Sequence, residues 1–321
     1  MGTTYSVVLY GDQHDRMAEA VDGAFAELHR LDGLLSPYRP ASAWSEINRL
    51  AAQGPVAVSP EVFNLISRCL RYSRQSLGTF DITVGPLLRT WGFYKGAGRL
   101  PSREDVTAAV ARVGYRHVRL DPARRTVRFD MQGLEIDPGG IGKGYAVDRI
   151  VEILRQRGFD AALVMASSSS IYGMGAPPGE ARGWRVDICD PKRPRQPAAE
   201  VFLKNMSLST SGAFPRALWA DGQIFSHIMD PRTGYPAQGM LSVSVVARHA
   251  IDSEAWTKPL FILGRSWAEK NRPRLRAYFC EERPGHTKEG LALALSATLP
   301  ATKGRVQVEC PSAGDSGRRM R

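Results

Sequence analysis

Apolar and polar residues follow two spacings along this chain, which predict strands in some segments and amphipathic helices in others. Residues 4–10 alternate as a first strand. Residues 15–35 repeat apolar positions at helical spacing, and the prolines of segment 36–40 end that helix. A short helix is expected over 44–50. A Ser-Pro pair then begins a helix over 59–76, because serine is a favoured N-cap and proline a favoured first residue.

Shorter elements are predicted for the rest of the chain, and loops separate them. They are a strand-like segment at 80–84 with a helical turn to Trp91, an exposed helix and hairpin within 99–130, strands at 161–165 and 184–189, a surface loop at 192–200, a hydroxyl-rich turn at 208–214, a strand entering a tight Pro–Gly turn at 225–237, and a strand, loop and buried helix at 242–264.

A glycine-rich loop that runs directly into an amphipathic helix occupies residues 137–158. Gly139, Gly140, Gly142 and Gly144 let the backbone approach a ligand closely. The helix start supplies N–H groups and partial positive charge, and Lys143 adds a full charge, so the loop suits a phosphate or pyrophosphate. The alternative is a turn that only lets the helix pack on a strand.

Composition and charge exclude several classes of protein. The chain has 321 residues, 43% of them hydrophobic, and no apolar run long enough to span a bilayer. Its start enters the strand pattern without the regions of a signal peptide, so the sequence leaves the compartment open. The formal net charge is +11, yet no basic stripe with aromatic residues accompanies it, so no nucleic-acid partner is predicted.

We expect one functional unit over residues 1–282 and a basic tail over 283–321. The tail carries seven Lys or Arg and three Asp or Glu, and its Gly, Pro and Ser content is typical of a flexible segment. Four cysteines, Cys69, Cys189, Cys280 and Cys310, have no metal-binding spacing. We expect them to be buried or unreactive thiols.

Six separated motifs together resemble the ApbE family of FAD:protein FMN transferases. In chain order they are MGTTYSV, SPYRPASAWSEINR, GTFDITVGPLLRTWGF, DPGGIGKGYAVDR, LSTSGAF and SHIMDPRTGYPA. The resemblance runs from residue 1 to about residue 264, which is most of the chain. One glycine-rich loop alone would identify nothing, whereas six stretches in the family's order are a specific match.

The resemblance implies an α+β fold of two lobes, with mixed or antiparallel sheets flanked by helices and the active site in the cleft between the lobes. Members of this family cleave FAD, transfer its FMN moiety to a Thr or Ser hydroxyl of an acceptor flavoprotein and release AMP, with Mg²⁺ as cofactor. The usual acceptors are subunits of bacterial respiratory or redox membrane complexes, and family members are often exported to the periplasmic side of the inner membrane. We therefore expect FAD as substrate, Mg²⁺ as cofactor and such an acceptor as partner.

By the same resemblance, Lys143, His227, Asp230 and Thr233 line the reaction centre. Lys143 would take up charge as AMP leaves, and His227 would act on the acceptor hydroxyl or orient a phosphate oxygen. Structural alternatives remain open for two of them. A lone histidine is often a structural residue, and Asp230 has the position of an Asx residue that organises the following Pro–Gly turn.

A second set of residues matches family segments that hold the flavin and the nucleotide. Its members are Ser36, Tyr38, Glu46, Asp81, Gly139, Gly140, Lys143, Asp148, Ser168, Ser169, Thr210, Ser211 and Gly212. Tyr38 would stack on a ring or only pack against neighbours. The residues at 210–212 would bind phosphate or build a turn.

The expected metal position departs from the family's pattern. The family binds Mg²⁺ through a loop carbonyl, here that of Gly142, and through an Asp and a Thr, whose positions are held by Glu254 and Lys258. A protonated lysine cannot be a ligand, so Thr257 or Asp252 would have to serve. A second departure is Ser167–Ser169 in place of Gly-Gly-Asp or Gly-Gly-Asn.

These departures leave two other functions open beside the transferase. One is an FAD pyrophosphatase that gives FMN and AMP to water. The other is a non-catalytic FAD-binding protein that has lost the metal. An assay of FAD turnover with and without an acceptor separates them.

Overall fold

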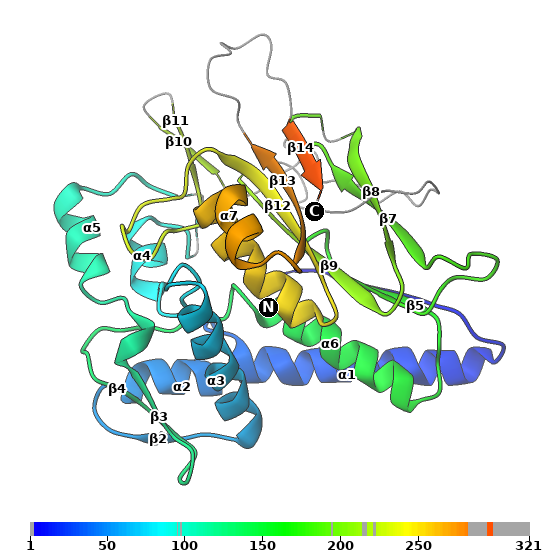
Figure 1. The fold of residues 1–321 in the computed structure, drawn as a ribbon. Helices are drawn as coiled ribbons and strands as arrows, with labels where there is room; N and C mark the ends of the chain where they lie inside the picture. The colour runs from blue at the N-terminus through cyan, green and yellow to red at the C-terminus, as the bar shows by residue number, and fades with distance from the viewer. Residues whose placement is uncertain are drawn as a thin grey trace, which may run out of the picture.

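The computed structural model describes residues 3–94, 96, 98–193, 195–213, 217–220, 223–281 and 294–297. Over these residues a seven-stranded antiparallel sheet carries helices on one face and a hairpin on the other. A second group of helices and short strands lies beside it (Figure 1). The α+β architecture with antiparallel sheets and flanking helices is therefore confirmed.

The large sheet forms from strands that are distant in sequence. In spatial order they are β1 (Tyr5–Leu9), β5 (Ala162–Ala166), β6 (Ser170–Met174), β9 (Met206–Gly212), β12 (Met240–Ala247), β13 (Arg276–Glu281) and β14 (Ala294–Ala297). All neighbouring strands are antiparallel. Alternate residues face opposite sides, so Val243 and Val245 enter the core beneath the helices while Val246 enters the core beneath the hairpin.

Three helices cover one face of this sheet. They are α1 (His14–Leu35), α6 (Gly142–Gln156) and α7 (Ala250–Asn271). Helices α6 and α7 pack on the strands and on each other, and α1 packs against α6 (Figure 1). The predicted apolar stripe of α6, including Ala146, Ile150 and Leu154, is fully buried. Gly264 has a positive φ of 76° and interrupts α7 with a kink.

A hairpin closes the opposite face of the sheet. It consists of β7 (Trp184–Cys189) and β8 (Pro197–Leu203), which pair as antiparallel strands. Trp184, Val186 and Leu203 form a separate apolar cluster with Ile171 and Leu208 of the large sheet. We call the large sheet, its three helices and this hairpin the sheet lobe.

The second group of elements, which we call the helical lobe, spans residues 43–129. It contains α2 (Ala43–Leu50), β2 (Val56–Ala57), α3 (Pro60–Gln75), α4 (Gly85–Thr90), α5 (Arg103–Val110), a 3₁₀ turn (Tyr115–His117), β3 (Val118–Asp121) and β4 (Thr126–Phe129). The predicted Ser59 cap is confirmed, since its hydroxyl accepts a hydrogen bond from Val62 N–H at 3.3 Å. The largest apolar core includes residues of both lobes.

A smaller core joins α4 and α5 to a second hairpin. Trp91, Val106 and Met229 are buried in it, and Phe225 packs against it. Phe225 belongs to the hairpin of β10 (Ala217–Ala220) and β11 (Gln223–Ser226). Trp91 also donates a hydrogen bond to Gly234 O at 2.8 Å, so the helical lobe holds the Pro–Gly turn that follows β11.

Three sequence expectations about secondary structure are wrong. The strand-like segment 80–84 forms turns, because Asp81 folds back on its own backbone. Part of the expected loop 192–200 belongs to β8. The expected turn at 208–214 instead lies mostly in β9, at the centre of the sheet.

The structure describes part of the C-terminal segment and three of the four cysteines. Four tail residues, Ala294–Ala297, form β14 on β13, and the other residues of the expected tail lie outside the described part of the chain. Cys69 and Cys280 are buried free thiols as expected, but Cys189 is disulfide-bonded, which corrects that expectation. No helix among the described residues is long and apolar enough to cross a membrane.

Candidate functional site

The glycine-rich loop turns tightly onto the start of α6. Pro138 O accepts hydrogen bonds from Ile141 N at 3.0 Å and from Gly142 N at 2.8 Å. Asp137 Oδ1 accepts a hydrogen bond from Gly139 N at 2.7 Å, which closes the preceding turn. Burial raises the pKa of Asp137, and the Gly139 N–H offsets part of that rise. The loop is therefore fixed by its own backbone before any ligand arrives.

Helix α6 meets α7 at Gly144, where a side chain would not fit. A Cβ atom on Gly144 would lie 2.3 Å from Ala250 O. This close approach brings the Glu254 carboxylate onto the α6 N-terminus, where Glu254 Oε2 accepts a hydrogen bond from Gly144 N at 2.6 Å. Glu254 is 2% exposed. A carboxylate at a helix N-terminus is favoured by the unpaired N–H groups and the helix dipole.

Two lysines lie against this buried carboxylate. Lys143 Nζ is 3.3 Å and Lys258 Nζ is 3.9 Å from Glu254 Oε1. Burial lowers the pKa of Lys258 to about 8, and Glu254 offsets part of that fall, so Lys258 is mainly an ammonium at neutral pH. Two positive charges and a helix terminus thus surround one negative charge. The site keeps an excess of positive charge that suits a diphosphate.

Two of the expected metal ligands are engaged by other groups of the fold. Thr257 Oγ1 donates to Glu254 O at 2.7 Å and accepts from Ser211 Oγ at 2.7 Å, so its hydroxyl is engaged within the fold. Asp252 bonds to Arg68 and Tyr72 of α3. The loop carbonyl that contacts Lys258 is that of Gly140, at 3.3 Å, rather than Gly142.

No group of three or more His, Cys, Asp or Glu residues that could hold a metal occurs among the residues that the structure describes. Glu254 Oε1 accepts no hydrogen bond from these residues, so one buried oxygen is open to a cation. The charges that face this oxygen are the Lys143 and Lys258 ammoniums. The residues present therefore fit a bound Mg²⁺ poorly.

Residues of the helical lobe and of the segments on either side of it form an aromatic and cationic group, which was only partly predicted. Tyr38 donates a hydrogen bond to Tyr94 O at 2.7 Å, and the two rings lie 5.0 Å apart between centroids. The Arg89 guanidinium lies 3.9 Å from the Tyr94 ring centroid and pairs with Glu135 at 2.5 Å. Glu135 precedes Asp137 by two positions, and the Arg89 charge offsets part of the rise that burial causes in the pKa of Asp137, so this group adjoins the glycine-rich loop.

Tyr38 is 47% exposed, so one aromatic surface beside the loop is open to a planar ligand. Tyr94 and Arg89 were not predicted from the sequence. Both lie within or next to the motif that ends at Phe93, but they are five positions apart, and no local pattern marks the contact between the guanidinium and the ring.

The segment with His227 forms a turn held by its own aspartate. The Asp230 carboxylate accepts hydrogen bonds from Arg232 N at 3.0 Å and from Arg232 Nη2 at 2.7 Å. Asp230 O accepts from Gly234 N at 2.9 Å. Thr233 is exposed and its hydroxyl accepts from Tyr235 N at 3.3 Å. The contacts of Asp230 are therefore those of a residue that organises the Pro–Gly turn. His227 lies half-buried immediately after β11.

Two acidic residues of the predicted nucleotide set are engaged within the fold. Asp81 accepts hydrogen bonds from Thr83 N and Tyr115 N, both at 2.8 Å. Asp148 accepts from Ala250 N at 2.6 Å and from Ile251 N at 3.0 Å, and so caps α7. Both carboxylates thus position elements of the site.

The remaining predicted residues lie in two places, one at the start of α2 and the other where the β5–β6 turn meets β9 through the Thr210 N–Ser169 O hydrogen bond of 2.9 Å. Ser36 is buried and Glu46 is exposed in the first turn of α2, near Tyr38 in the chain. Ser168 and Ser169 lie in the turn between β5 and β6, where Ser169 Oγ donates to Ala166 O at 3.1 Å. Thr210 bonds to Ser244, and Gly212 ends β9. Ser211, through Thr257, is the member of this strand that reaches the Glu254 site.

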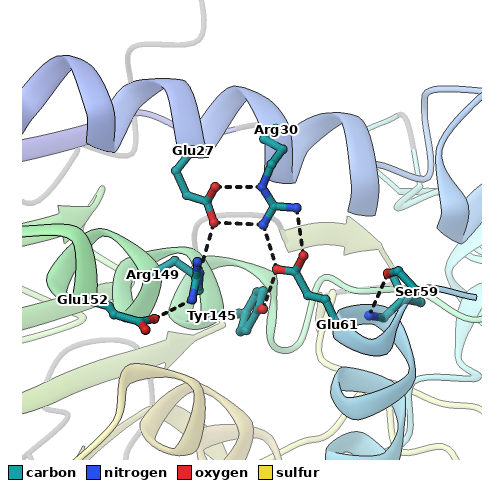
Figure 2. Close-up of polar contacts among 8 residues, drawn as sticks. Glu27, Arg30, Ser59, Glu61, Tyr145, Arg149 and Glu152 are labelled. Atoms are coloured by element: carbon teal, nitrogen blue, oxygen red, sulfur yellow. Dashed lines mark hydrogen bonds and ion pairs between the residues drawn. The ribbon is translucent and has the colours of Figure 1, made fainter. Parts of the chain in front are cut away.

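A charged network fixes the start of α6 from the other side (Figure 2). Arg30 of α1 pairs with Glu27 at 2.7 Å and with Glu61 of α3 at 2.8 Å. Tyr145 donates to Glu61 at 2.6 Å, and Arg149 donates to Glu27 at 3.0 Å. Hydrogen bonds from Arg30 lower the pKa of both glutamates. Because Tyr145 follows Lys143 by two positions, the network holds the helix turn that carries Lys143.

Comparison with known proteins gives a consistent result. The ApbE family model matches residues 1–279. The chain is 31% identical over 299 residues to the FAD:protein FMN transferase of Escherichia coli K12, which covers 90% of this chain and 83% of that protein. It is 32% identical over 259 residues to the enzyme of the same name from Treponema pallidum, covering 76% and 71%.

Solved structures agree with the sequence matches. The ApbE protein of Thermotoga maritima superposes with a TM-score of 0.81 at 28% identity, covering 92% of this chain and 94% of that one. The apo form of the flavinyl transferase ApbE of Pseudomonas stutzeri superposes with a TM-score of 0.79 at 30% identity, covering 93% and 92%. With a family match over most of its length, this chain belongs to the ApbE family.

Proposed function

We propose that this protein is a transferase that moves the FMN moiety of FAD to a Thr or Ser hydroxyl of an acceptor flavoprotein and releases AMP. Relatives named FAD:protein FMN transferase support the reaction. The observation that carries the proposal is the pair of ammoniums, Lys143 and Lys258, at the N-terminus of α6. This arrangement is suited to a diphosphate, the group that such a reaction must bind and cleave.

The reaction needs positioning and charge neutralisation more than a protein nucleophile. The acceptor hydroxyl oxygen forms a bond to the phosphorus of the FMN half, and the bond from that phosphorus to the AMP oxygen breaks. AMP leaves with the electron pair of the broken bond, and the hydroxyl proton passes to a base. Lys143 would stabilise the charge that develops on AMP, and His227 is the proposed base.

The flavin ring and the acceptor protein also need partners in this proposal. Tyr38 and Tyr94 would bind the isoalloxazine ring beside the glycine-rich loop, with Arg89 beneath the Tyr94 ring. The acceptor is proposed to be a flavoprotein subunit of a bacterial respiratory or redox membrane complex. Mg²⁺ would supply charge neutralisation at the diphosphate if bound. The ligand set around Glu254 supports it poorly, so no step is assigned to it.

The decisive experiment incubates the purified protein with FAD and a candidate acceptor, followed by mass spectrometry of the acceptor. We expect one FMN attached through a phosphoester to a single hydroxyl and an equal amount of AMP. Lys143→Ala should reduce the rate and the FAD affinity by about tenfold or more, because a charge-assisted contact is lost. Lys270→Ala, at an exposed position of α7, is the matched control and should retain both.

Two other outcomes would contradict the proposal. Free FMN and AMP with an unlabelled acceptor would establish a pyrophosphatase. FAD that stays bound and intact in the presence of acceptor, with and without Mg²⁺, would establish a flavin-binding protein without transfer activity.

A further inference from the structure

We infer that the Lys258 ammonium occupies the cation position of this site, so that this protein binds the diphosphate of its substrate without a divalent metal ion. The inference rests on the proposed function in one respect, namely that FAD is the ligand. It deepens that proposal because it assigns the positive charge at the diphosphate to a side chain of this chain.

The surroundings of the Lys258 ammonium are those of a hard cation. Its Nζ lies 3.0 Å from Glu254 O, 3.3 Å from Gly140 O and 3.9 Å from Glu254 Oε1. The contacts are thus two carbonyl oxygens and one carboxylate oxygen, which are ligand types that Mg²⁺ also takes. They come from the glycine-rich loop and from α7, so the ammonium links the same two elements that a bridging ion would link.

Other groups that would complete a metal site are used within the fold. The Thr257 hydroxyl donates to a carbonyl of its own helix and accepts from Ser211, so its hydrogen and one of its two lone pairs are already used within the fold. Asp252 is directed to Arg68 and Tyr72 on α3. Only one carboxylate, Glu254, therefore remains among these candidates, and it already accepts the Gly144 N–H.

Charge balance favours the same assignment. Glu254 Oε1 is buried and accepts no hydrogen bond from the described residues, and Lys143 and Lys258 are the cations beside it. A divalent ion bound to this oxygen would lie next to both ammoniums, and like charges in a buried site repel strongly. The side chain of Lys258 is 22% exposed, so part of it is accessible from outside the fold.

The first test uses the unmodified protein. FAD binding, followed by quenching of flavin fluorescence, should give the same dissociation constant within about twofold in EDTA and in Mg²⁺. When Mn²⁺ is added to protein that is saturated with FAD, electron paramagnetic resonance should show that the Mn²⁺ remains free. A dissociation constant that rises tenfold or more in EDTA, or one Mn²⁺ bound tightly per chain, would overturn the inference.

The second test changes the ammonium. Lys258→Met keeps an unbranched side chain that is one atom shorter and removes the charge, so FAD affinity in EDTA should fall about tenfold or more. Lys258→Arg keeps a positive charge and should recover most of that loss. Lys270→Met, the same substitution at an exposed position of α7, should have no effect. Equal affinity of Lys258→Met and the unmodified protein in EDTA would contradict the assignment.

The outcomes separate this inference from the proposed function. Transfer of FMN to the acceptor only in Mg²⁺ would leave the function standing and overturn the inference. Metal-independent FAD binding without transfer would leave the inference standing and overturn the function. Absence of FAD binding in both buffers would overturn both.

Discussion

Among single residues, Asp81 and Asp148 show how a buried carboxylate can hold two segments of the site together. Each accepts hydrogen bonds from backbone N–H groups of another segment, Asp81 from Tyr115 N and Asp148 from Ala250 N. Burial raises the pKa of both to about 6, and the backbone hydrogen bonds offset part of that rise. An acidic residue that matches a family ligand segment by position therefore also holds the fold together.

The raised pKa of Asp81 predicts a specific dependence of stability on pH. Because its folded pKa of about 6 exceeds the ordinary value of 3.8, protonation of Asp81 favours the folded state. This contribution is present below about pH 3.8 and is lost as the pH rises through about 6. The unfolding free energy of the native protein minus that of Asp81→Asn should thus be larger at about pH 4 than at about pH 7, by up to about 3 kcal/mol.

Urea unfolding at the two pH values measures this difference. An asparagine can still accept from Thr83 N, but its amide nitrogen cannot accept from Tyr115 N, so the variant should be less stable at each pH. The readout is therefore the change of the difference with pH and not its absolute size. A difference that is constant between the two pH values would contradict the prediction.

At the scale of elements, the sequence predicted most helices and several strands but placed β9 in a turn. Helices α1, α3 and α6 were recognisable because their apolar positions recur on one face and their ends carry proline, serine or glycine signals. Strand β9 has Ser207, Ser209 and Ser211 on one face, a polar pattern typical of a turn. Their hydroxyls bond to Ser253 and Thr257 of α7. Such pairing between distant segments satisfies buried polar groups and is invisible in a local pattern.

The contact between α6 and α7 depends on the absence of a side chain at Gly144. In Gly144→Ala the added methyl group would lie 2.3 Å from Ala250 O, so the two helices must separate and Gly144 N can no longer reach Glu254. We expect the free energy of unfolding to fall by about 1–3 kcal/mol and the affinity for FAD to fall with it.

Thermal and urea unfolding and an FAD titration measure these effects. Gly33→Ala is the matched control, because Gly33 also lies within a helix, α1, but a Cβ there meets nothing within 4 Å. That variant should gain up to about 1 kcal/mol from helix propensity. If both variants had the same stability and affinity, the close contact at Gly144 would not constrain the site.

For the whole molecule, the sequence indicated that a glycine-rich loop and a following helix would hold phosphate, and the structure adds what meets them. Lys143 could be predicted because it follows the loop directly. The resemblance put Lys258 at the expected metal position, but its contact with Gly140 O, 118 residues earlier, could not be predicted because it depends on how α7 crosses the start of α6. Tyr94 and Arg89 were missed for the same reason, since their contact with each other and the pairing of Arg89 with Glu135 exist only in the folded chain.

Because the proposed ligand would contact both lobes, it should stabilise them together. Tyr38 belongs to the segment that leads into the helical lobe, Lys143 and Lys258 belong to the sheet lobe, and one apolar core includes residues of both. We therefore expect far-UV circular dichroism and tryptophan fluorescence to report one coincident unfolding transition.

FAD at about 100 times its dissociation constant should raise the unfolding free energy by about 2.7 kcal/mol and shift the transition equally in both probes. AMP, which lacks the flavin half, is the control and should stabilise less at equal concentration. A transition that splits in FAD, with one probe shifted and the other unchanged, would place the ligand on one lobe only.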